Sequence, residues 1–254
     1  MNSIKKMMLS GALGCLISGM AYADGSSPQP VKPYWQDIQV VAVNKEKPRS
    51  SFMSYADRET ALTSRFEKSP YYSLLNGTWK FFFVDSYKDL PQNITDPSVN
   101  TSSWDDITVP GNWEVQGHGV AIYTNHGYEF KPRNPQPPLL LEANPVGVYR
   151  RDIEIPASWD NRDIYLHIGG AKSGLYVYLN GKEVGYSEDS KNPAEFLINK
   201  YLQPGKNVLT LKIFRWSTGS YLECQDFWRM SGIERDVFLW SQPKASIQDF
   251  RVVS

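Results

Sequence analysis

The sequence predicts an all-β fold, an antiparallel sandwich or barrel. Short segments in which apolar and polar residues alternate follow one another through the second half, and no helical periodicity separates them. Asn180-Gly181 lies between two such segments, and this dipeptide is the strongest short-range signal for a β-hairpin. Because the alternation is one-sided, we expect each sheet to bury one face and to leave the other in water.

Composition narrows the class of protein. The 254 residues suit one large β domain or two ordinary ones, and an apolar fraction of 41% is enough for a packed core. The formal net charge is zero, so the chain has no electrostatic footprint for nucleic acid or anionic lipid. Neither partner is therefore expected.

Residues 1–23 predict an export signal. Lys5 and Lys6 precede an apolar run that ends in the sequence AYA at positions 21–23, the small-x-small pattern that signal peptidase cleaves. We expect cleavage after Ala23 and a periplasmic or secreted protein. The apolar run is too short and too interrupted by Gly and Ser to span a bilayer. The alternative is lipidation at Cys15, but Ala12 occupies the position where Leu is usual.

Removal of the signal leaves Cys224 as the one cysteine of the mature chain. An exported chain with one cysteine forms no internal disulfide, so its stability depends on the core. We expect Cys224 to be a packed thiol and not a nucleophile, because none of the three histidines lies near it in sequence.

An N-terminal arm is predicted over residues 24–70. Its first part, residues 24–33, is rich in Ser, Pro and Gln and is typical of a flexible lead. The segments Tyr34–Asp37 and Val40–Asn44 are expected to be extended. One short helix is expected at Arg58–Phe66.

A sandwich or barrel domain is expected over residues 71–242, where the strand patterns lie. The expected strands are Thr78–Val84, Ile107–Val109, Tyr149–Ile155, Ile164–Ile168, Leu175–Leu179, Glu183–Tyr186, Val208–Phe214 and Val237–Trp240. A further strand pattern at Ile247–Val252 has no partner after it. We therefore interpret residues 243–254 as the first strand of a following domain, and the sequence as the front portion of a longer protein.

Two connections between these strands have unusual compositions. The first connection, Asn112–Pro145, contains four aromatic residues before a Pro-rich run that cannot be a central strand. The second connection, Arg215–Val237, has the sequence RWSTGSYLECQDFWRMSGIERDV. Sugars present apolar C–H faces and hydroxyl rims, so aromatic rings beside carboxylates and amides suit a sugar-binding site.

The charges of the second connection leave two interpretations open. Its cations and acids nearly balance and could form an ion-pair network that holds a long loop in place. The residues concerned are Arg215, Arg229, Arg235, Glu223, Asp226, Glu234 and Asp236. Asp226 is the best candidate for a functional group, because it lies midway between the strands and is flanked by Gln225 and Phe227.

Several motifs resemble the N-terminal sugar-binding domain of glycoside hydrolase family 2. They are YTN at Tyr123–Asn125, ANPVGVYRRDIEIP at Ala143–Pro156, LNGKEVGYSEDSKNPAEF at Leu179–Phe196, and the second connection with the FLW that follows it. Within the family the chain is similar to bacterial β-galactosidases. The resemblance implies a jelly-roll sandwich, followed by an immunoglobulin-like domain and a TIM barrel that holds both catalytic glutamates.

The resemblance also implies roles for two residues. Asn125 matches an asparagine that reaches the active site and hydrogen-bonds the galactosyl unit. Asp226 matches an aspartate that ligates a sodium ion and contacts the galactose 6-hydroxyl. Magnesium ligands of the family lie outside this sequence, and so do its catalytic residues. Glu223 and Asp226 are spaced like a carboxylate pair, but one sandwich loop offers no dry site to separate their pKa values.

We therefore expect the N-terminal part of a β-galactosidase, which contributes to the galactoside pocket but contains no bond-breaking group. Its expected partners are the galactoside, the C-terminal domains of the same enzyme and further copies in a homo-oligomer. Two alternatives stay open. One is a free-standing galactoside-binding lectin, and the other is the same domain of a β-glucuronidase or β-mannosidase.

Overall fold

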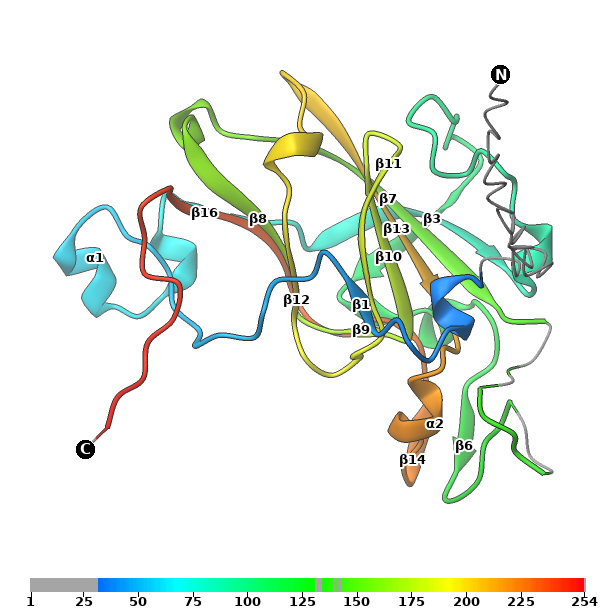
Figure 1. The fold of residues 1–254 in the computed structure, drawn as a ribbon. Helices are drawn as coiled ribbons and strands as arrows, with labels where there is room; N and C mark the ends of the chain where they lie inside the picture. The colour runs from blue at the N-terminus through cyan, green and yellow to red at the C-terminus, as the bar shows by residue number, and fades with distance from the viewer. Residues whose placement is uncertain (1–31, 131–133, 139, 141–142, 254) are drawn as a thin grey trace, which may run out of the picture. The chain divides into compact units, whose positions relative to one another are not determined.

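Two antiparallel sheets face each other in the computed structural model, which describes residues 32–130, 134–138, 140 and 143–253 (Figure 1). The larger sheet has the strand order β1-β11-β10-β13-β7-β3-β4 and the smaller one β12-β8-β16-β2. Every strand pairing in the described residues is antiparallel. The predicted all-β sandwich is confirmed. The expected signal peptide, with Cys15, lies outside the described residues.

The strands of the larger sheet are β1 Ala42–Val43, β3 Gly77–Val84, β4 Asp105–Val109, β7 Val146–Glu154, β10 Gly174–Leu179, β11 Lys182–Ser187 and β13 Lys206–Phe214. The strands of the smaller sheet are β2 Tyr72–Leu74, β8 Arg162–Ile168, β12 Ala194–Leu197 and β16 Val237–Pro243. Between the sheets lies one apolar core, to which Leu211 of the larger sheet and Leu166 and Leu239 of the smaller one contribute fully buried side chains. Alternation along each strand directs these residues inward.

The predicted hairpin is confirmed at Asn180-Gly181. Both residues have positive φ, 53° and 77°, as a two-residue hairpin turn requires. The turn joins β10 to β11, in which Leu179 lies opposite Lys182 and Leu175 opposite Ser187.

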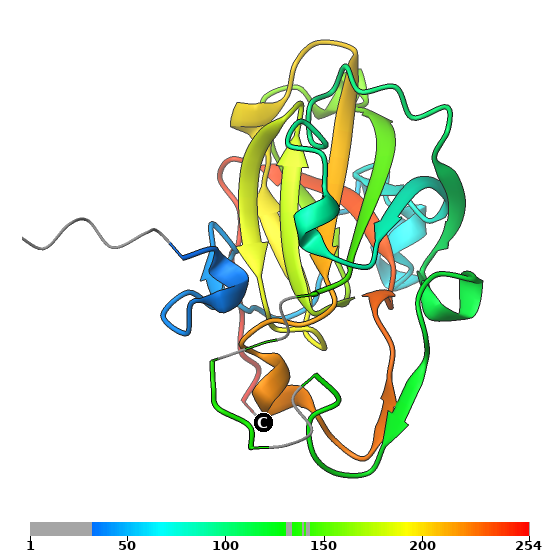
Figure 2. The same cartoon turned by 90° about the vertical axis from the view of Figure 1, so that its right-hand side faces the viewer.

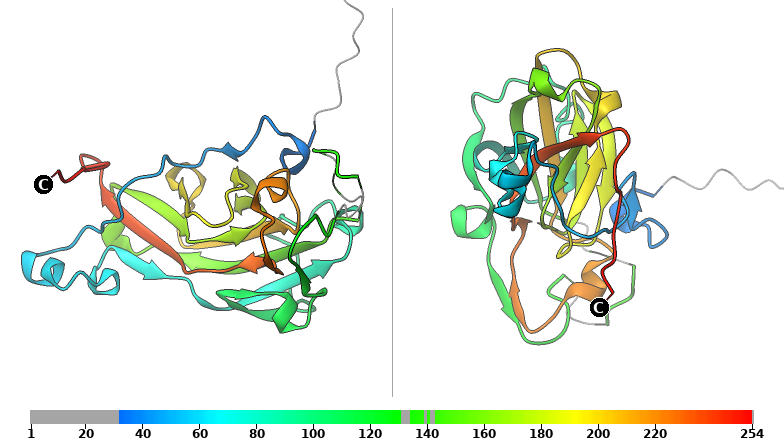
Figure 3. Two further views of the ribbon diagram at one scale, coloured as in Figure 1. Left: turned by 90° about the horizontal axis from the view of Figure 1, so that it is seen from below. Right: turned by 90° about the vertical axis from the view of Figure 1, so that its left-hand side faces the viewer.

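The expectation that each sheet leaves one face in water is wrong. A second apolar cluster covers the outer face of the larger sheet, where Trp35 of the arm packs on Phe214 with ring centroids 5.0 Å apart. A third cluster covers the outer face of the smaller sheet and joins Met53 of the arm to Trp240. Figure 3 shows the arm running along the sandwich. The strands carry aromatic residues on both faces, so one-sided alternation was an incomplete description of them.

The arm is less extended than predicted. Residues Tyr34–Gln36 form a 3-10 turn, η1, where extended chain was expected. The expected helix is present as α1, Arg58–Leu62, with Asp57 as its N-cap, but it is shorter than predicted. Ser64 has a φ of 55°, which is incompatible with a continuing right-handed helix. A second 3-10 turn, η2, follows at Phe66–Lys68.

The strand expected at Ile247–Val252 is absent from the structure. A strand forms when its backbone groups pair with a neighbour, and here the segment instead contacts the arm. The Ser50 amide donates to Asp249 at 2.9 Å, and the Phe250 ring lies 5.6 Å from Phe52. The assignment of residues 243–254 to a following domain stays a prediction.

The remaining elements are short. The 3-10 turns are η3 Tyr87–Asp89, η4 Glu114–Gln116, η5 Ala157–Trp159 and η6 Asn199–Tyr201, and one helical turn, α2, covers Ser220–Glu223. A small sheet joins β5 Gly111–Asn112, β15 Gly232–Ile233 and β9 Ala171–Lys172 in the order β5-β15-β9. The last sheet pairs β6 Ile122–Thr124 with β14 Phe227–Arg229. In the described part of the chain, no helix has the length and apolar character that a membrane span needs.

Candidate functional site

The two unusual connections meet in a two-stranded ribbon, formed by β6 of the first connection and β14 of the second. Thr124 pairs with Phe227, and Tyr123 pairs with Trp228. The ladder ends there, because Asn125 and Asp226, the next residue on each side, both lie at bends. Figure 2 shows the two strands side by side where they project from the sandwich. The structure therefore places the two residues that the sequence singled out at the same end of the ribbon.

The ribbon has two different faces. Tyr123 and Trp228 lie opposite each other and therefore share one face of the ribbon. We call these two residues, with the adjoining bend residues Asn125 and Asp226, the outward face. All four are exposed, and Tyr123 and Trp228 keep 55% and 52% of their surface accessible. On the other face, Arg229 is almost completely buried. The ribbon is thus attached to the body by one face and presents aromatic, amide and carboxylate groups on the other.

Direct contacts organise the outward face. The Tyr123 hydroxyl donates to Oδ1 of Asp226 at 2.7 Å. The rings of Tyr123 and Trp228 meet edge to face, with centroids 5.7 Å apart. Oδ1 of Asn125 lies 2.7 Å from Nδ1 of His126. Tyr123 is thus in direct contact with both Asp226 and Trp228.

A buried ion pair attaches the ribbon to the first connection. Nε of Arg229 lies 3.2 Å from Oε2 of Glu129, and these side chains are only 1% and 5% exposed. The indole of Trp216 donates to the other oxygen of Glu129 at 2.9 Å. Arg229 also donates to the carbonyl oxygens of Gln225 and Phe227. Breaking such a pair leaves a buried charge without compensation, so the ribbon is held firmly at this point.

A second buried pair lies at the base of the ribbon. Nη2 of Arg215 lies 3.8 Å from Oε1 of Glu114 and donates to the carbonyl oxygens of Val120 and Arg229 at 2.7 and 3.1 Å. The Ser231 amide donates to Oε2 of Glu114 at 2.9 Å. Burial raises the pKa of Glu114 more than these contacts lower it. Arg215 therefore ties both connections together through their backbones.

These pairs revise the predicted charge network. The cations Arg215 and Arg229 are paired, as the network interpretation expected, but their partners Glu114 and Glu129 belong to the first connection. Sequence reasoning missed both glutamates. The one available signal was that each is an acid within an otherwise aromatic loop. Asp226, in contrast, is not paired with a cation in the described part of the chain and remains on the outward face.

The inner face of the ribbon also rests on a buried lysine. Lys172 of β9 is 4% exposed, and its ammonium lies 4.9 Å from the centre of the Phe227 ring. Lys191 approaches the same ring at 5.7 Å. Burial lowers the pKa of Lys172. Since β9 is paired within the small β5-β15-β9 sheet, this cation–π contact ties the start of β14, next to Asp226, to that sheet.

Glu223 and Asp226 do not form a carboxylate pair. The Ser190 amide and hydroxyl donate to the two oxygens of Glu223 at 2.8 and 2.6 Å. Burial raises the pKa of Glu223, although its bonds to Ser190 oppose this. Its neighbour Cys224 donates to Glu129 across 3.8 Å, and burial raises the pKa of its thiol to about 11. Cys224 is thus the packed thiol that was predicted.

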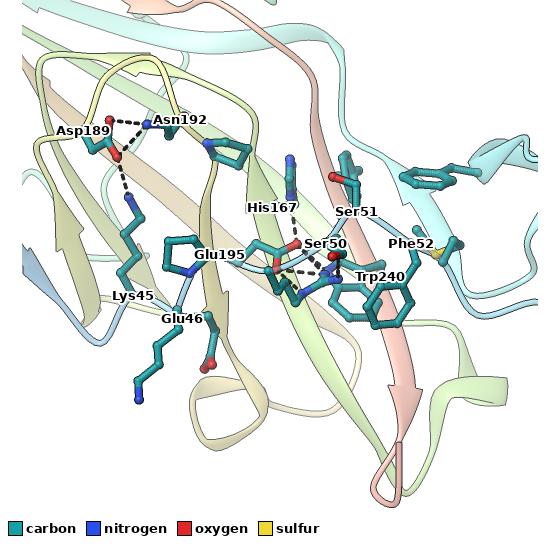
Figure 4. A pocket seen from close by; sticks show the side chains of 17 residues that line it. Lys45, Glu46, Ser50, Ser51, Phe52, His167, Asp189, Asn192, Glu195 and Trp240 are labelled. Carbon is teal, nitrogen blue, oxygen red and sulfur yellow. Dashed lines mark hydrogen bonds and ion pairs between the residues drawn. The ribbon is translucent and has the colours of Figure 1, made fainter. Parts of the chain in front are cut away.

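A cavity of about 330 Å³ lies elsewhere, between the arm and the outer face of the smaller sheet (Figure 4). Its central carboxylate, Glu195, accepts from Nη2 of Arg49 at 3.0 Å and from the indole of Trp240 at 3.0 Å, and lies 2.8 Å from Nδ1 of His167. Arg49 also lies 4.5 Å above the Trp240 ring. These groups are already satisfied by one another, so the cluster holds the arm on the sheet.

The metal-binding capacity of the ribbon is small. Within the described residues, no group of three His, Cys, Asp or Glu side chains could hold a metal ion. One oxygen of Asp226 accepts from Tyr123, and its second oxygen receives no hydrogen bond from the described part of the chain. A carboxylate oxygen suits a hard cation. Asp226 therefore fits a sodium ion as one ligand, provided that other groups complete the shell.

The two facing sheets define an antiparallel β-sandwich domain, and comparison with known proteins identifies its family. Residues 72–243 match the profile described as glycosyl hydrolases family 2, sugar binding domain. The chain is 40% identical over 225 residues to a β-galactosidase of Priestia megaterium, which covers 87% of this chain and 22% of that protein. A β-galactosidase of Actinobacillus pleuropneumoniae is 40% identical over 217 residues, or 85% and 21% of the two chains. The chain belongs to glycosyl hydrolase family 2.

A solved structure supports the same fold. The β-glucuronidase of Bacteroides uniformis aligns with a TM-score of 0.51 and 25% identity, over 68% of this chain and 18% of that one. The chain spans about a fifth of the length of the β-galactosidases that it matches. Family and fold are thus established for the described domain, as the sequence motifs predicted.

Proposed function

We propose that this chain is the N-terminal part of a β-galactosidase and that its ribbon forms one wall of the galactoside pocket. The proposal is supported by the β6–β14 register, in which Thr124 pairs with Phe227, and by the exposure of Asn125 and Asp226 next to that pair. An amide offers both donors and an acceptor, and a carboxylate accepts from hydroxyls. Together they suit the hydroxyl rim of a sugar, while the neighbouring rings suit its C–H face.

A galactoside fits the outward face better than a glucuronide does. The similar sequences of high identity are named β-galactosidases, whereas the similar solved structure, at 25% identity, is a β-glucuronidase. None of the four outward-face residues is basic, and Asp226 is acidic. A glucuronate carboxylate beside Asp226 would meet like charge, which is unfavourable, whereas a neutral galactosyl unit would not.

In this proposal, bond cleavage is performed outside the described chain. Retaining hydrolysis uses two carboxylates about 5 Å apart, and Glu223, the acid closest in sequence to Asp226, is occupied by Ser190. Asp226 would accept from a sugar hydroxyl and supply one ligand to a sodium ion. A bound sodium ion would add positive charge beside the sugar oxygen. Any magnesium ligands would be located in other parts of the protein.

Activity measurements test the proposal. The 254-residue chain alone should release no product from a nitrophenyl galactoside, and the complete protein that carries it should release product. In the complete protein, Asp226→Ala should weaken galactoside binding about tenfold or more, because a hydrogen bond to a charged group is lost. The same variant should weaken the response to sodium.

A matched control separates the ribbon from the cavity. Asn192 lines the cavity, and among the described residues its side-chain amide donates to Asp189 alone, at 3.1 Å. Asn192→Ala should therefore leave galactoside binding unchanged. The proposal fails if Asp226→Ala behaves like Asn192→Ala. A lectin function would instead be supported if the 254-residue chain alone bound galactosides in calorimetry.

A further inference from the structure

The contact between Tyr123 and Asp226 links the two strands of the ribbon diagonally. Tyr123 belongs to β6, and Asp226 lies one residue before β14. The phenol donates to Oδ1 across 2.7 Å, although 103 residues separate the two in sequence. In the described part of the chain, Oδ1 is the oxygen of Asp226 that is engaged, while Oδ2 stays open. The bond therefore distinguishes between two otherwise equivalent oxygens.

An exposed aspartate without this bond would have considerable rotational freedom. Hydrogen bonds to an ionised carboxylate are about twice as strong as neutral ones, and such a bond selects one orientation of the group. Tyr123 is itself held by its edge-to-face contact with Trp228, at 5.7 Å. The phenol is therefore a supported donor and not a freely rotating one.

The backbone beneath this contact is already fixed. The Phe227 ring lies over the ammonium of Lys172 at 4.9 Å, and Arg229 is paired with Glu129. These contacts restrain the residues that follow Asp226 in β14. The Asp226 side chain could still rotate, and its hydrogen bond from Tyr123 restricts that rotation.

We propose that Tyr123 is a positioning residue, whose hydroxyl holds Oδ1 of Asp226 so that Oδ2 is presented to a galactosyl hydroxyl. This inference rests on the proposed function and assigns to Tyr123 a role in the same site. Tyr123 acts through Asp226 and need not touch the sugar.

A double-mutant cycle in the complete protein tests the role. Tyr123→Phe removes only the hydroxyl and should raise KM for a nitrophenyl galactoside about 2- to 10-fold, as expected for one hydrogen bond. Tyr128→Phe is the matched control, because its hydroxyl donates to the Tyr221 carbonyl at 3.2 Å, away from Asp226, and its KM should not change. In the Asp226→Ala background, Tyr123→Phe should have no further effect.

The kinetics separate the inference from the proposed function. The inference is overturned if Tyr123→Phe raises KM equally with and without Asp226. If Asp226→Ala itself leaves KM unchanged, the proposed function fails first. If Asp226→Ala raises KM and Tyr123→Phe does not, the role of Tyr123 alone is rejected.

Discussion

Arg229 and Glu129 form a buried ion pair, with Nε and Oε2 3.2 Å apart, that joins the two long connections of the domain. The pair lies directly behind the outward face, because Arg229 is the residue after Trp228 in β14. Its two members are separated by 100 residues in the sequence. The orientation of the candidate sugar-binding surface therefore depends on a contact that is itself inaccessible to ligand.

Removing one member of this pair should be costly. Arg229→Met leaves Glu129 buried without a countercharge, and the expected loss of unfolding free energy is about 3 to 5 kcal/mol, measured in urea. The control is Lys80→Met, which breaks the exposed pair between Lys80 and Asp106 at 2.8 Å. That loss should be below about 1 kcal/mol. Equal losses in the two variants would contradict the structural role of the buried pair.

The arm should contribute strongly to stability, because it completes a core cluster. Trp35 is 1% exposed and stacks on Phe214 with centroids 5.0 Å apart. Trp35→Ala should therefore cost about 3 to 5 kcal/mol of unfolding free energy. Val41→Ala alters an arm residue that is mostly exposed and should change stability by less than about 0.5 kcal/mol. A small effect of Trp35→Ala would show that the arm is dispensable.

The cluster of Arg49, His167 and Trp240 around Glu195 should stabilise the fold less in acid. Burial alone would raise the pKa of Glu195, but the hydrogen bond from His167 and the charge of Arg49 outweigh it and lower the pKa below 4.5. The folded state therefore favours the carboxylate. This contribution to stability is present above the ordinary pKa and is lost as the pH falls through the lower folded value.

Urea unfolding of the parent protein and of Glu195→Gln, compared between pH 7 and about pH 3, checks this sign. The difference in stability should be largest at pH 7 and should shrink as the pH falls. Asp152→Asn alters an exposed carboxylate paired with Lys206 at 3.0 Å and should give a small, nearly constant difference. If the difference in unfolding free energy between the parent and Glu195→Gln grew as the pH fell, the lowered pKa of Glu195 would be refuted.

Cys224 should react slowly with alkylating reagents at neutral pH. The thiolate is the nucleophile, and burial raises the pKa of this thiol to about 11 from 9.0. The alkylation rate by iodoacetamide should therefore keep rising about tenfold per pH unit beyond pH 9. A plateau near pH 9, measured by mass spectrometry of the modified peptide, would indicate an exposed thiol with an ordinary pKa.

Much of the fold could be predicted from the sequence, because the longer strands show a clear alternation of apolar and polar residues. Strands such as β8 and β13 alternate clearly, and the turn at Asn180 and Gly181 is encoded by two residues. The burial of the outer sheet faces could not be predicted, because residues of the arm cover them. Trp35 packs on the larger sheet through contacts with residues far away in the sequence, and no local pattern around Trp35 predicts them.

The candidate site was predictable in part. Asn125 and Asp226 were identified from loop composition and family motifs, but strands of three residues such as β6 and β14 have too little length to show a period. The supporting residues Glu129 and Lys172 act through long-range contacts with β14. Such contacts become visible only once the register of the ribbon is known.

A crystal structure of the complete protein with a non-hydrolysable galactoside tests the central claim most directly. The account predicts that Oδ2 of Asp226 and the amide of Asn125 lie within hydrogen-bond distance, about 2.6 to 3.2 Å, of hydroxyls on one galactosyl ring. A galactosyl ring bound away from the ribbon, for example in the cavity beside Trp240, would contradict it.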